Sequence, residues 1–516
     1  MRSVEEQWVV RASDQRTLDE RAYAAGVAQD ALMESAGTNA AQWILDRMHP
    51  RRVVVVSGPG GNGGDGLVVA RRLHEAGIEV QAALLQDPMG CSPAVQRMIE
   101  RMEKAGVPAP RPVSDRMFEA WLDRADCLVD SLFGSGLRRP LRGEALRVVG
   151  RINAAQVCTI SLDLPSGLAS DTGERVGEAV QADITLAMAF LKPAHLLCPA
   201  AMHCGNTAVV DVAYPEATVE SVEPWARVCE SAGIASRLPV RRLDGHKGTF
   251  GRVLVLAGSL GMTGAAVLCC RGALRAGAGL VSVATPASVA SIVATAVPEA
   301  ITIPMLETEG RLAGIDDPQF ERAMERADVL VMGPGLSREA DTLEAVRALI
   351  ERFNGPIVLD ADAHGAVHRN EDVLERLAGR TILTPHPGEF GALTGEAPDA
   401  VDRLRRDQAR AFAMKHNVVL VLKGHPTAIG LPEGTVYLNP TGNDGLATGG
   451  SGDVLAGLIA GLVAGGSSLP NAAVVAVYVH GLAAEIYGRD RSPRALIPSE
   501  LIDQIPEALW EVTECS

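Results

Sequence analysis

The sequence predicts an α/β protein made of two three-layer α/β/α domains, and three observations carry this prediction. Runs of Val, Ile and Leu of strand length alternate with helical patterns, which is typical of parallel sheets covered by helices on both faces. The 516 residues are more than one hydrophobic core usually serves, and the alternation stops once, at 214–247, before it starts again. Glycine accounts for 53 residues and aromatic residues for only 3%, so small aliphatic side chains must fill the cores and the backbone must make many tight turns.

In the first half, a helical pattern covers residues 65–76, where Leu67, Val68, Ala70 and Leu73 fall on one side. Residues 214–247 carry mixed charge, three prolines and no strong period, which predicts a domain boundary near 220–235. We therefore expect domains at 1–222 and 236–516. The predicted strands of the first domain are 51–58, 78–85, 125–133, 158–165, 182–189 and 206–213.

The second half repeats the alternation but not the glycine motifs, so the halves are not copies of each other. Residues 263–279 predict a helix of small residues, and a long Gly-rich helix is expected after 441–453. The Gly-rich surface at 455–466 could pack within the domain or between subunits. The predicted strands of this half are 251–259, 280–286, 327–335, 356–364, 381–387 and 418–424.

Composition excludes several classes of function. The formal charge of −15, with no basic run longer than a pair of arginines, argues against nucleic-acid binding. A small anionic ligand is still possible, because backbone N–H groups can hold it locally. The nine cysteines include no C-x-x-C pair and indicate free thiols in a reducing cytosol. The first residues lack the apolar core of a signal peptide and no membrane-spanning helix is expected, so we expect a cytoplasmic protein.

The loop SGPGGNGGDG (57–66) lies between a predicted strand and a predicted helix, where a phosphate-binding turn belongs. Three of its glycines fit G-x-G-x-x-G, which is typical of a Rossmann dinucleotide site with Asp87 on the ribose. Asp65 would repel a pyrophosphate, however, and Asn62 adds a side-chain oxygen, so a cation beside a phosphate fits better. A plain strand-to-helix turn with Asp65 as its cap is the simpler alternative.

Two further loops follow later strands of the same half. Residues 129–143 contain Asp130, and residues 162–173 contain Asp163 and Ser166. Loops at the carboxyl ends of parallel strands converge on one crevice, so these side chains are expected near Asn62. Their oxygens suit a hard cation, and Asp163 could exchange a proton with substrate. Singly, each carboxylate could be only a turn or cap residue.

These motifs resemble the NAD(P)H-hydrate epimerase family, also called the YjeF N-terminal domain. The matching stretches are MESAG (33–37), GNGGDGLVVARRL (61–73), VDSLFGSGL (129–137) and LDLPSGL (162–168). The resemblance covers residues 10–215, although Gly61 and Ser35 stand where the family has Asn. It implies that Asn62, Asp130 and Ser166 hold a potassium ion and that Asp163 contacts the reacting substrate. The implied contacts to hydrated NAD(P)H are Gly61, Asn62, Gly63, Gly64, Asp65, Gly134, Ser135, Gly136, Leu137, Arg138, Arg139, Pro140 and Asp163.

The strongest motif of the second half is TGNDGLATGGSGD (441–453), which leads directly into an apolar helix. Such a loop aims several N–H groups at one point, with the helix dipole behind them, and predicts an anion hole for a phosphoryl group. Asp453 could take a proton from an attacking hydroxyl. There is no Walker A motif, since HKGTFG (246–251) lacks G-K-[ST]. A simple Gly-rich helix start is the alternative.

Other loops of this half add polar groups. Lys423, Gly424 and Thr427 follow a strand where they could meet a nucleotide, and His386 is held between two prolines. Asp360 and Asp362 could bind a metal or water or could cap the next segment. For Mg²⁺ or water, the candidate ligands are Asp362, Asn439 and Glu389.

This half resembles the ribokinase-like superfamily through GGSGD, and more closely the ADP- or ATP-dependent NAD(P)H-hydrate dehydratase family. The matching stretches, within residues 240–505, are 246–259, 264–286, 333–336, 359–363, 384–389, 422–427 and 443–457. The resemblance implies a Rossmann-like first domain followed by a ribokinase-like second one. It implies substrate contacts at Ala265, Gly335, His386 and Asp453. The implied contacts to ADP or ATP, with Mg²⁺, are Lys423, Gly424, His425, Pro426, Thr427 and Gly452.

Together the resemblances imply a bifunctional enzyme that interconverts the R and S forms of hydrated NADH or NADPH and dehydrates the S form with ADP or ATP. In the first step Asp163 would handle the proton; in the second Asp453 would deprotonate the hydroxyl. The alternatives are a ribokinase-like small-molecule kinase fused to a non-catalytic dinucleotide-binding domain, and an NAD-dependent oxidoreductase. A homo-oligomer is expected.

Overall fold

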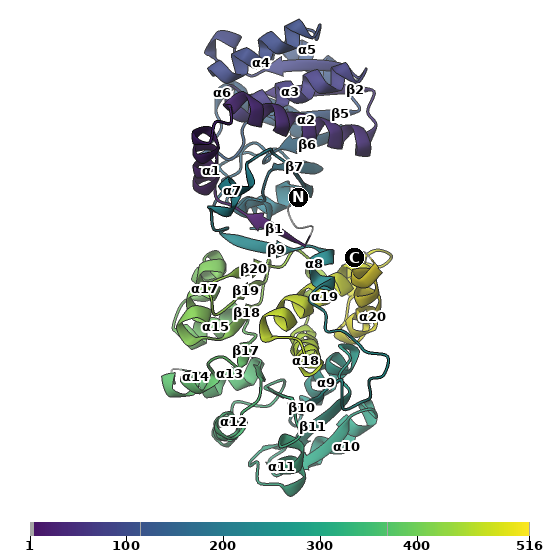
Figure 1. The fold of residues 1–516 in the computed structure, drawn as a ribbon. Helices are drawn as coiled ribbons and strands as arrows, with labels where there is room; N and C mark the ends of the chain where they lie inside the picture. The colour runs from purple at the N-terminus through teal and green to yellow at the C-terminus, as the bar shows by residue number, and fades with distance from the viewer. Residues whose placement is uncertain (1–4, 114, 369, 515–516) are drawn as a thin grey trace. The chain divides into compact units, whose positions relative to one another are not determined.

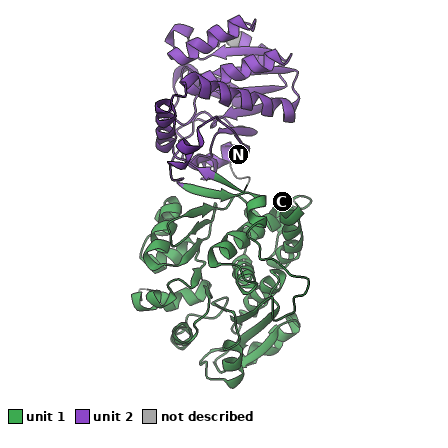
Figure 2. Cartoon of the chain, in the orientation of Figure 1, with its two compact units in different colours: residues 1–7, 226–516 green, residues 8–225 purple. Residues whose placement is uncertain are grey.

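Two separate sheets organise the chain in the computed structural model, which describes residues 5–113, 115–368 and 370–514. Residues 8–225 form one compact unit, called the first unit below (purple, labelled unit 2 in Figure 2). Residues 226–516 form the other, called the second unit, together with the N-terminal segment up to Gln7 (green, labelled unit 1 in Figure 2). In each unit helices flank a mainly parallel sheet (Figure 1), which confirms the predicted α/β class. The cysteines described by the structure are all free thiols.

The sheet of residues 8–225 has seven parallel strands. Val53 and Val55 of its central strand face one core and Val54 and Val56 the other, which explains the unbroken valine run. In sheet order the strands are β4 (Arg111–Pro112), β3 (Glu79–Leu84), β2 (Arg52–Ser57), β5 (Cys127–Ser131), β6 (Cys158–Leu162), β7 (Ile184–Met188) and β8 (Asn206–Val210).

Helices cover both faces of this sheet. One core is built with α1 (Ala12–Ala24), α2 (Gln29–Met48), α3 (Gly61–Glu75) and α4 (Pro93–Lys104), and the opposite one with α5 (Asp115–Leu122) and α6 (Gly143–Ala154). Shorter elements are η1 (Pro88–Gly90), η2 (Pro193–His195), η3 (Ala200–His203) and α7 (Glu216–Glu220). The strand order reverses between β2 and β5, the point at which sheets of this kind bind ligands.

Helix α3 begins at Gly61, four residues before the predicted start at Asp65. The glycine loop itself forms the first helical turn, with the Gly64 N–H donating to the Gly60 carbonyl at 3.2 Å. A Cβ at Gly63 would lie 1.9 Å from the Gly58 carbonyl oxygen, so this turn closes only with glycine. The absence of side chains, which hid the helix in the sequence, lets it start close to the end of β2.

The second unit has an eleven-stranded sheet. Seven neighbouring strands, β12, β11, β10, β15, β16, β17 and β18, run parallel, and β19 is antiparallel to both of its neighbours. Its strands are, in sheet order, β1 (Glu6–Val9), β9 (Ala226–Cys229), β20 (Val436–Leu438), β19 (Ala428–Gly430), β18 (Val419–Leu422), β17 (Thr381–Leu383), β16 (Ile357–Leu359), β15 (Val329–Met332), β10 (Arg252–Leu256), β11 (Leu280–Pro286) and β12 (Ile301–Met305). A separate ribbon pairs β13 (Glu307–Thr308) with β14 (Arg311–Leu312).

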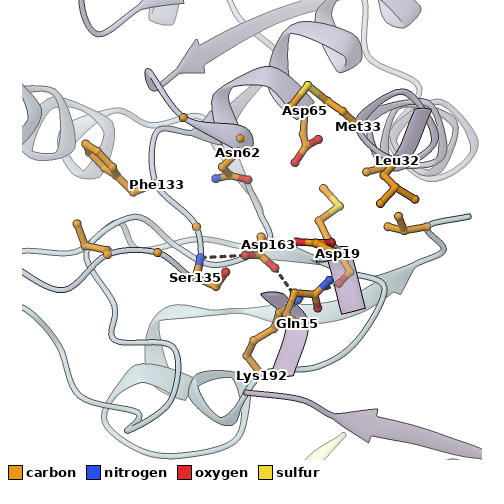
Figure 3. Close-up of a pocket in the computed structure, with 18 of the residues that line it drawn as sticks. Gln15, Asp19, Leu32, Met33, Asn62, Asp65, Phe133, Ser135, Asp163 and Lys192 are labelled. Carbon is orange, nitrogen blue, oxygen red and sulfur yellow. Dashed lines mark hydrogen bonds and ion pairs between the residues drawn. The ribbon is translucent and has the colours of Figure 1, made fainter. Parts of the chain in front are cut away.

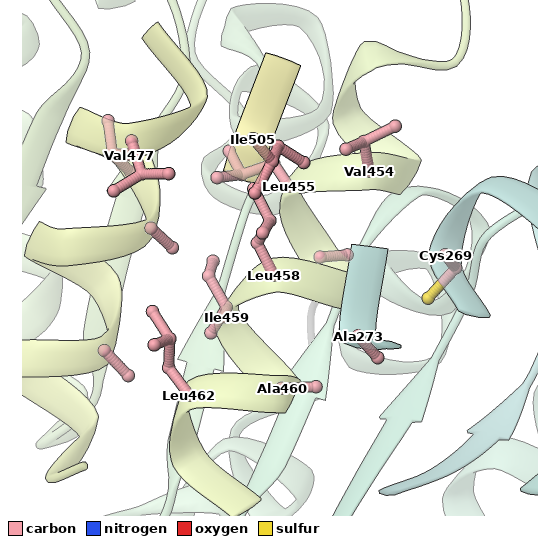
Figure 4. Close-up of a cluster of buried hydrophobic side chains, with 14 of the residues drawn as sticks. Cys269, Ala273, Val454, Leu455, Leu458, Ile459, Ala460, Leu462, Val477 and Ile505 are labelled. Atoms are coloured by element: carbon pink, nitrogen blue, oxygen red, sulfur yellow. The ribbon is translucent and has the colours of Figure 1, made fainter. Parts of the chain in front are cut away.

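The helices α9 (Thr263–Arg275), α18 (Ser451–Ala464), α19 (Leu469–Gly488) and α20 (Pro498–Glu514) share one core with this sheet. A Cβ at Gly457 would lie 2.1 Å from the Cys269 carbonyl oxygen, and one at Gly461 would lie 2.5 Å from that of Ala273. The Gly-rich surface of α18 therefore packs on α9 within the unit (Figure 4). By length and composition, α19 alone among the described helices could cross a membrane, but most of it is buried here.

The remaining helices and turns complete the second unit. They are α8 (Ser231–Ala235), α10 (Ala287–Ala296), α11 (Pro318–Met324), α12 (Ala340–Arg352), η4 (Ala361–Ala363), α13 (His364–Val367), α14 (Glu371–Leu377), α15 (Pro387–Thr394), α16 (Pro398–Arg403), α17 (Arg405–His416), η5 (Asp444–Leu446) and η6 (Pro493–Ala495). Here the strand order reverses between β10 and β15, which defines a second crevice at their carboxyl ends.

Two candidate active sites

A cavity of about 700 Å³ opens at the switch point between β2 and β5 (Figure 3). It brings together the loop residues 134–139, the start of α3 and the turn after β6. Of the predicted contacts, Gly61, Asn62, Asp65, Gly134, Ser135, Gly136, Leu137, Arg138, Arg139 and Asp163 line it. The other three, Gly63, Gly64 and Pro140, do not, and neither does Asp87.

Asp163 is the most constrained residue of this cavity. It follows β6 with a φ of 63°, a left-handed conformation that costs energy for a residue with a side chain. Its Oδ1 lies 2.7 Å from the Nζ of Lys192, and its Oδ2 accepts a hydrogen bond of 3.0 Å from the Ser135 N–H. Burial alone would raise the pKa of Asp163, but the Lys192 ammonium outweighs it and the pKa falls below its ordinary value. Asp163 is therefore ionised at neutral pH.

Lys192 was not expected from the sequence. Its side chain is 1% exposed, and its Nζ also donates to the carbonyls of Met188 and Phe190 at 2.8 and 3.0 Å. The neighbouring His195 accepts from the Lys192 N–H at Nδ1, so its Nε2 donates to the Asp163 carbonyl at 2.7 Å. Burial, with the Lys192 charge, lowers the pKa of His195 to about 4 and keeps the ring neutral. The signal for Lys192 in the sequence was its position directly after an apolar run, since the carboxyl ends of parallel strands are where ligand sites form.

Asn62 and Asp65 project from α3 into the cavity. Both amide atoms of Asn62 are enclosed without a hydrogen-bond partner in the described chain. The N-cap of α3 is Gly60, with no side-chain cap, so the alternative reading of Asp65 as a helix cap is wrong. A Cβ at Gly134 would lie 2.7 Å from the Asp163 Oδ2 and 3.3 Å from the Asn62 Cγ, so only glycine lets this loop approach both side chains.

Asp130 and Ser166 lie behind the cavity, both fully buried. The Asp130 carboxylate accepts hydrogen bonds from the Ser166 hydroxyl and N–H at 2.7 and 2.9 Å, from the Ser161 hydroxyl at 2.9 Å and from the Leu132 N–H at 3.2 Å. All four donors are neutral. Asn62 forms a hydrogen bond with neither Asp130 nor Ser166 in the described residues.

In the second unit, an ion-paired cluster joins the ends of three strands. The Lys423 Nζ after β18 lies 2.9 Å from the Asp360 Oδ1 after β16 and 3.9 Å from the Glu389 Oε2. Asp360 is 1% exposed and also accepts from the Thr384 hydroxyl at 2.7 Å. Despite burial, the pairing lowers the pKa of Asp360 and raises that of Lys423, so both are charged. Asp360 thus fixes Lys423; it stands at the N-cap position of η4, but its side chain makes no capping hydrogen bond.

Lys423 reaches the GGSGD loop, because a Cβ at Gly452 would lie 3.2 Å from its Nζ. Asp453 stands in the first turn of α18 beside it. Burial and the charge of Asp360 raise the pKa of Asp453 to about 7, against the opposing effect of Lys423. His480 of α19 was not predicted from the sequence. Its Nε2 lies 2.9 Å from the Ser451 carbonyl oxygen, and this contact fixes the start of α18.

The other predicted contacts lie on neighbouring loops. Gly335 has a φ of 57°, and a Cβ there would lie 2.9 Å from that of Ala265, so these two residues adjoin. In the loop 423–427, the Thr427 hydroxyl donates to the Gly424 carbonyl at 3.0 Å. The Arg405 guanidinium donates to the Lys423 carbonyl at 2.5 Å and fills the space that a side chain at 424 would need. The Arg405 side chain thereby fixes the conformation of the loop 423–427.

His386 is the N-cap of α15, where its Nδ1 accepts from the N–H groups of Gly388 and Glu389 at 3.0 and 3.2 Å. The ring is about half exposed and lines a cavity of about 530 Å³ together with His364 and His368. Ala265, Gly335, Lys423 and Asp453 do not line this cavity. His386 therefore has a structural role besides any contact with substrate.

The three candidate Mg²⁺ ligands each have a partner. Asp362 accepts from the Ser337 N–H at 3.0 Å and from Arg338 at 2.8 Å. The Asn439 amide donates to the Thr441 carbonyl at 2.8 Å, and Glu389 accepts from the His386 N–H at 2.9 Å. Within residues 5–113, 115–368 and 370–514, no three His, Cys, Asp or Glu side chains are grouped as a metal site.

Comparison with known families divides the chain in the same way. A sequence model of the family described as YjeF-related protein N-terminus matches residues 29–194, and one described as NAD(P)H-hydrate dehydratase matches residues 253–507.

Proteins similar over nearly the whole length are known. A bifunctional NAD(P)H-hydrate repair enzyme of Moorella thermoacetica is 39% identical over 94% of this chain and 93% of its own length, and one of Thermofilum pendens is 37% identical over 98% and 97%. Among solved structures, an ADP/ATP-dependent NAD(P)H-hydrate dehydratase of Bacillus subtilis, co-crystallised with ATP and Mg²⁺, is 32% identical. It covers 55% of this chain and 97% of its own, with a TM-score of 0.48.

Proposed function

The chain belongs to the family of bifunctional NAD(P)H-hydrate repair enzymes, and from this premise we propose where each reaction takes place. The cavity around Asp163 would interconvert the R and S forms of the hydrated cofactor. The strand ends around Asp453 would dehydrate the S form at the expense of ADP or ATP. The observation that carries the second assignment is the Lys423 ammonium held beside the GGSGD loop.

Family membership decides between the functions considered from the sequence. The fusion of a small-molecule kinase to a non-catalytic domain and the NAD-dependent oxidoreductase both give way to cofactor repair. Hydrated NAD(P)H suits both domains. Its dinucleotide suits a Rossmann-like pocket, and its hydroxyl can be phosphorylated at a ribokinase-like phosphate loop.

For epimerisation, we place the hydrated nicotinamide ring against Asp163. The carbon that carries the hydroxyl, C6, is bonded to the ring nitrogen, whose lone pair can support an iminium-like state when the hydroxyl departs. Asp163, ionised by Lys192, is suited to take a proton from the water that returns. The buried ion pair with Lys192 and the bond to Ser135 fix the position of this carboxylate.

The enclosed Asn62 amide supports the potassium site that the resemblance implies, whereas the Asp130 carboxylate already accepts four hydrogen bonds. Asp130 is a buried carboxylate faced by neutral donors only, and the enclosed Asn62 amide lacks partners in the described chain. We propose that Asn62, Asp130 and Ser166 hold the ion, which would supply positive charge near the phosphate of the substrate.

Removal of potassium should therefore slow epimerisation several-fold. After dialysis into a sodium or tetramethylammonium buffer, the R-to-S rate would fall and would recover when K⁺ is added. Dehydration of the pure S form serves as the control. An R-to-S rate that is the same in K⁺ and tetramethylammonium buffers would refute the assignment of this ion.

For dehydration, Asp453 takes the proton of the substrate hydroxyl, and the oxygen attacks the terminal phosphoryl group of the nucleotide. The bond from that phosphorus to the bridging oxygen breaks, and the nucleotide leaves as AMP from ADP or as ADP from ATP. Lys423 and the N–H groups at the start of α18 offset the charge of the transferring phosphoryl. The ring nitrogen lone pair then expels phosphate as the C6–O bond breaks, and loss of a proton from C5 restores the dihydronicotinamide. We place the nucleotide on the 423–427 loop and Gly452, and the substrate near Ala265, Gly335 and His386.

We also propose that Mg²⁺ enters this site with the nucleotide. Asp362, Asn439 and Glu389 are each engaged elsewhere, which is unlike a site that holds a metal by protein groups alone. Mg²⁺ is commonly bound through substrate phosphates with only one or two carboxylates. Of the three, Glu389 is the one we assign to the metal or its water, because it belongs to the ion-paired cluster of Lys423 and Asp360.

Dehydration should increase with pH up to about 8. Asp453 acts only when ionised, and its pKa of about 7 reflects burial and the charges that face it, those of Asp360, Lys423, Asp362 and Glu389. Between pH 6 and pH 8 the ionised fraction, and with it kcat for the S form, would increase about tenfold. A rate that is flat from pH 5 upwards would show that the base is a carboxyl with an ordinary pKa, or another group.

Nucleotide dependence tests the proposed function. Hydrated NADH incubated with the protein and ADP or ATP should regain absorbance at 340 nm, as NADH forms, and release one inorganic phosphate per NADH. Omission of nucleotide should abolish the recovery. Accumulation of a stable phosphorylated product instead would favour the kinase alternative. The cytoplasmic location and the homo-oligomer expected from the sequence remain predictions, the latter testable by light scattering.

A further inference from the structure

We propose that Asp65 is a second catalytic carboxyl of the epimerase cavity and works on the opposite side of the nicotinamide ring from Asp163. This inference rests on the proposed epimerase function and goes further by naming both proton-transfer groups. The resemblance to the epimerase family implies only that Asp65 is one of the contacts that bind the substrate.

The two carboxyl groups come from different walls of the cavity. Asp65 belongs to α3, whereas Asp163 lies on the turn after β6, and both line the cavity. Figure 3 shows the Asp65 carboxyl pointing into the open space, across from Asp163 and Asp19. In the described chain the Asp65 carboxyl has neither a hydrogen bond nor an ion pair to occupy it.

Asp19 is the other acid of this cavity, but it is engaged. The Tyr214 hydroxyl donates to its carboxylate, and that hydroxyl in turn accepts from the Gln15 amide at 2.6 Å. Asp65 has no such partner in the described chain, so its carboxyl is available to contact a ligand in the cavity. The Lys192 ammonium is bound to Asp163 rather than to Asp65.

Burial and the surrounding charges shift the pKa values of the two carboxyls in opposite directions. Burial, together with the charges of Asp163 and Asp19, raises the pKa of Asp65 well above its usual range. The pKa of Asp163 is lowered instead, because the Lys192 ammonium outweighs burial. The Asp65 carboxyl, whose pKa is raised, therefore faces an ionised Asp163 across the cavity, and two carboxyls whose pKa values are pushed apart in this way are suited to act as acid and base.

Inversion at C6 requires two faces of the ring. Protonated Asp65 gives its proton to the C6 hydroxyl, the C6–O bond breaks, and water leaves while the nitrogen lone pair forms the N1=C6 iminium. A solvent water then adds to C6 from the other face and gives its proton to Asp163. Asp65 ends as carboxylate and Asp163 as acid, and the reverse reaction exchanges their roles. Proton exchange with solvent restores the starting state, so one water leaves and one enters.

The test compares Asp65→Asn with Glu75→Gln, a matched change at the far end of the same helix. Glu75 pairs with Arg71 and Arg72 and does not line the cavity. The assay starts from the purified R form and measures the NADH formed in the presence of ADP. Dehydration of the pure S form by the same variant serves as the reference. We expect R-to-S conversion to fall by about 10²–10⁴ in Asp65→Asn. Glu75→Gln and wild type should agree.

Conversion by Asp65→Asn within threefold of wild type would overturn the inference. If wild type itself does not convert the R form, the proposed function fails instead. Should Asp65→Asn unfold the first unit, Asp65→Glu, which keeps the acid, must regain more activity than Asp65→Asn. In ¹⁸O-water, wild type should place solvent oxygen on C6 of the S form at each turnover; retention of the original oxygen would contradict C–O cleavage.

Discussion

The variant Asp453→Asn should lose dehydration by about 10²–10⁴ in kcat, because Asn cannot take the proton of the substrate hydroxyl. The start of α18 and Lys423 would still bind the phosphates, so the KM for ADP should change little. The fold should survive, since Asp453 stands in the first turn of α18 and Asn preserves its size. Stopped assays of NADH formation from the pure S form, with ADP saturating, measure the effect.

The epimerase activity of the same variant provides its control. R-to-S conversion takes place in the other unit and should equal that of wild type. A dehydration rate within tenfold of wild type would remove Asp453 from the role of base and would leave Lys423 and the backbone amides as the main source of catalysis.

The variant Asp163→Asn should lose R-to-S conversion by a similar factor, because the ionised carboxylate of the epimerase cavity is gone. It should also be less stable. The Lys192 ammonium is buried, and loss of Asp163, its carboxylate partner in the described structure, leaves a charge without compensation. Removing one partner of a buried ion pair typically costs about 3–5 kcal/mol. Thermal unfolding of the variant and its R-to-S rate measure the two effects separately.

Dehydration of the S form again separates loss of chemistry from loss of fold. With ADP, Asp163→Asn should convert the S share of a mixture and leave the R share, apart from slow spontaneous exchange. Unchanged R-to-S conversion would refute the assignment of Asp163. A double variant with Lys192→Met, which removes the uncompensated charge, should regain stability without regaining epimerisation.

The strands and the loops after them could be predicted because each strand is a buried apolar run that ends in glycine or a polar residue. Asp163 and Lys423 directly follow such strands and Asp130 lies near the end of one, so sheet topology brings Asp130 and Asp163 to one crevice and Lys423 to the other. Asp453 follows no strand and was predicted from the glycine loop that leads into α18. The start of α3 could not be predicted. Gly61 to Gly64 have poor helix propensity, and the helix forms there because only glycine fits against the Gly58 carbonyl.

Partners distant in sequence were also beyond prediction. Lys192 meets Asp163, and Lys423 meets Asp360, only after the loops have taken their final conformations. In the sequence, each of these residues is only a charged side chain near the end of a strand, and nothing beside it indicates its partner. The same holds for Arg405 beneath the 423–427 loop and for His480 beneath the start of α18.

The most direct test of two cooperating sites is the extent of NADH recovery from a mixture of R and S hydrated NADH. With wild-type protein, K⁺, Mg²⁺ and excess ADP, the account predicts that all of the hydrate returns to NADH, with one phosphate released for each molecule. Recovery that stops at the S share would contradict the epimerase site. No recovery at all would contradict the dehydratase site.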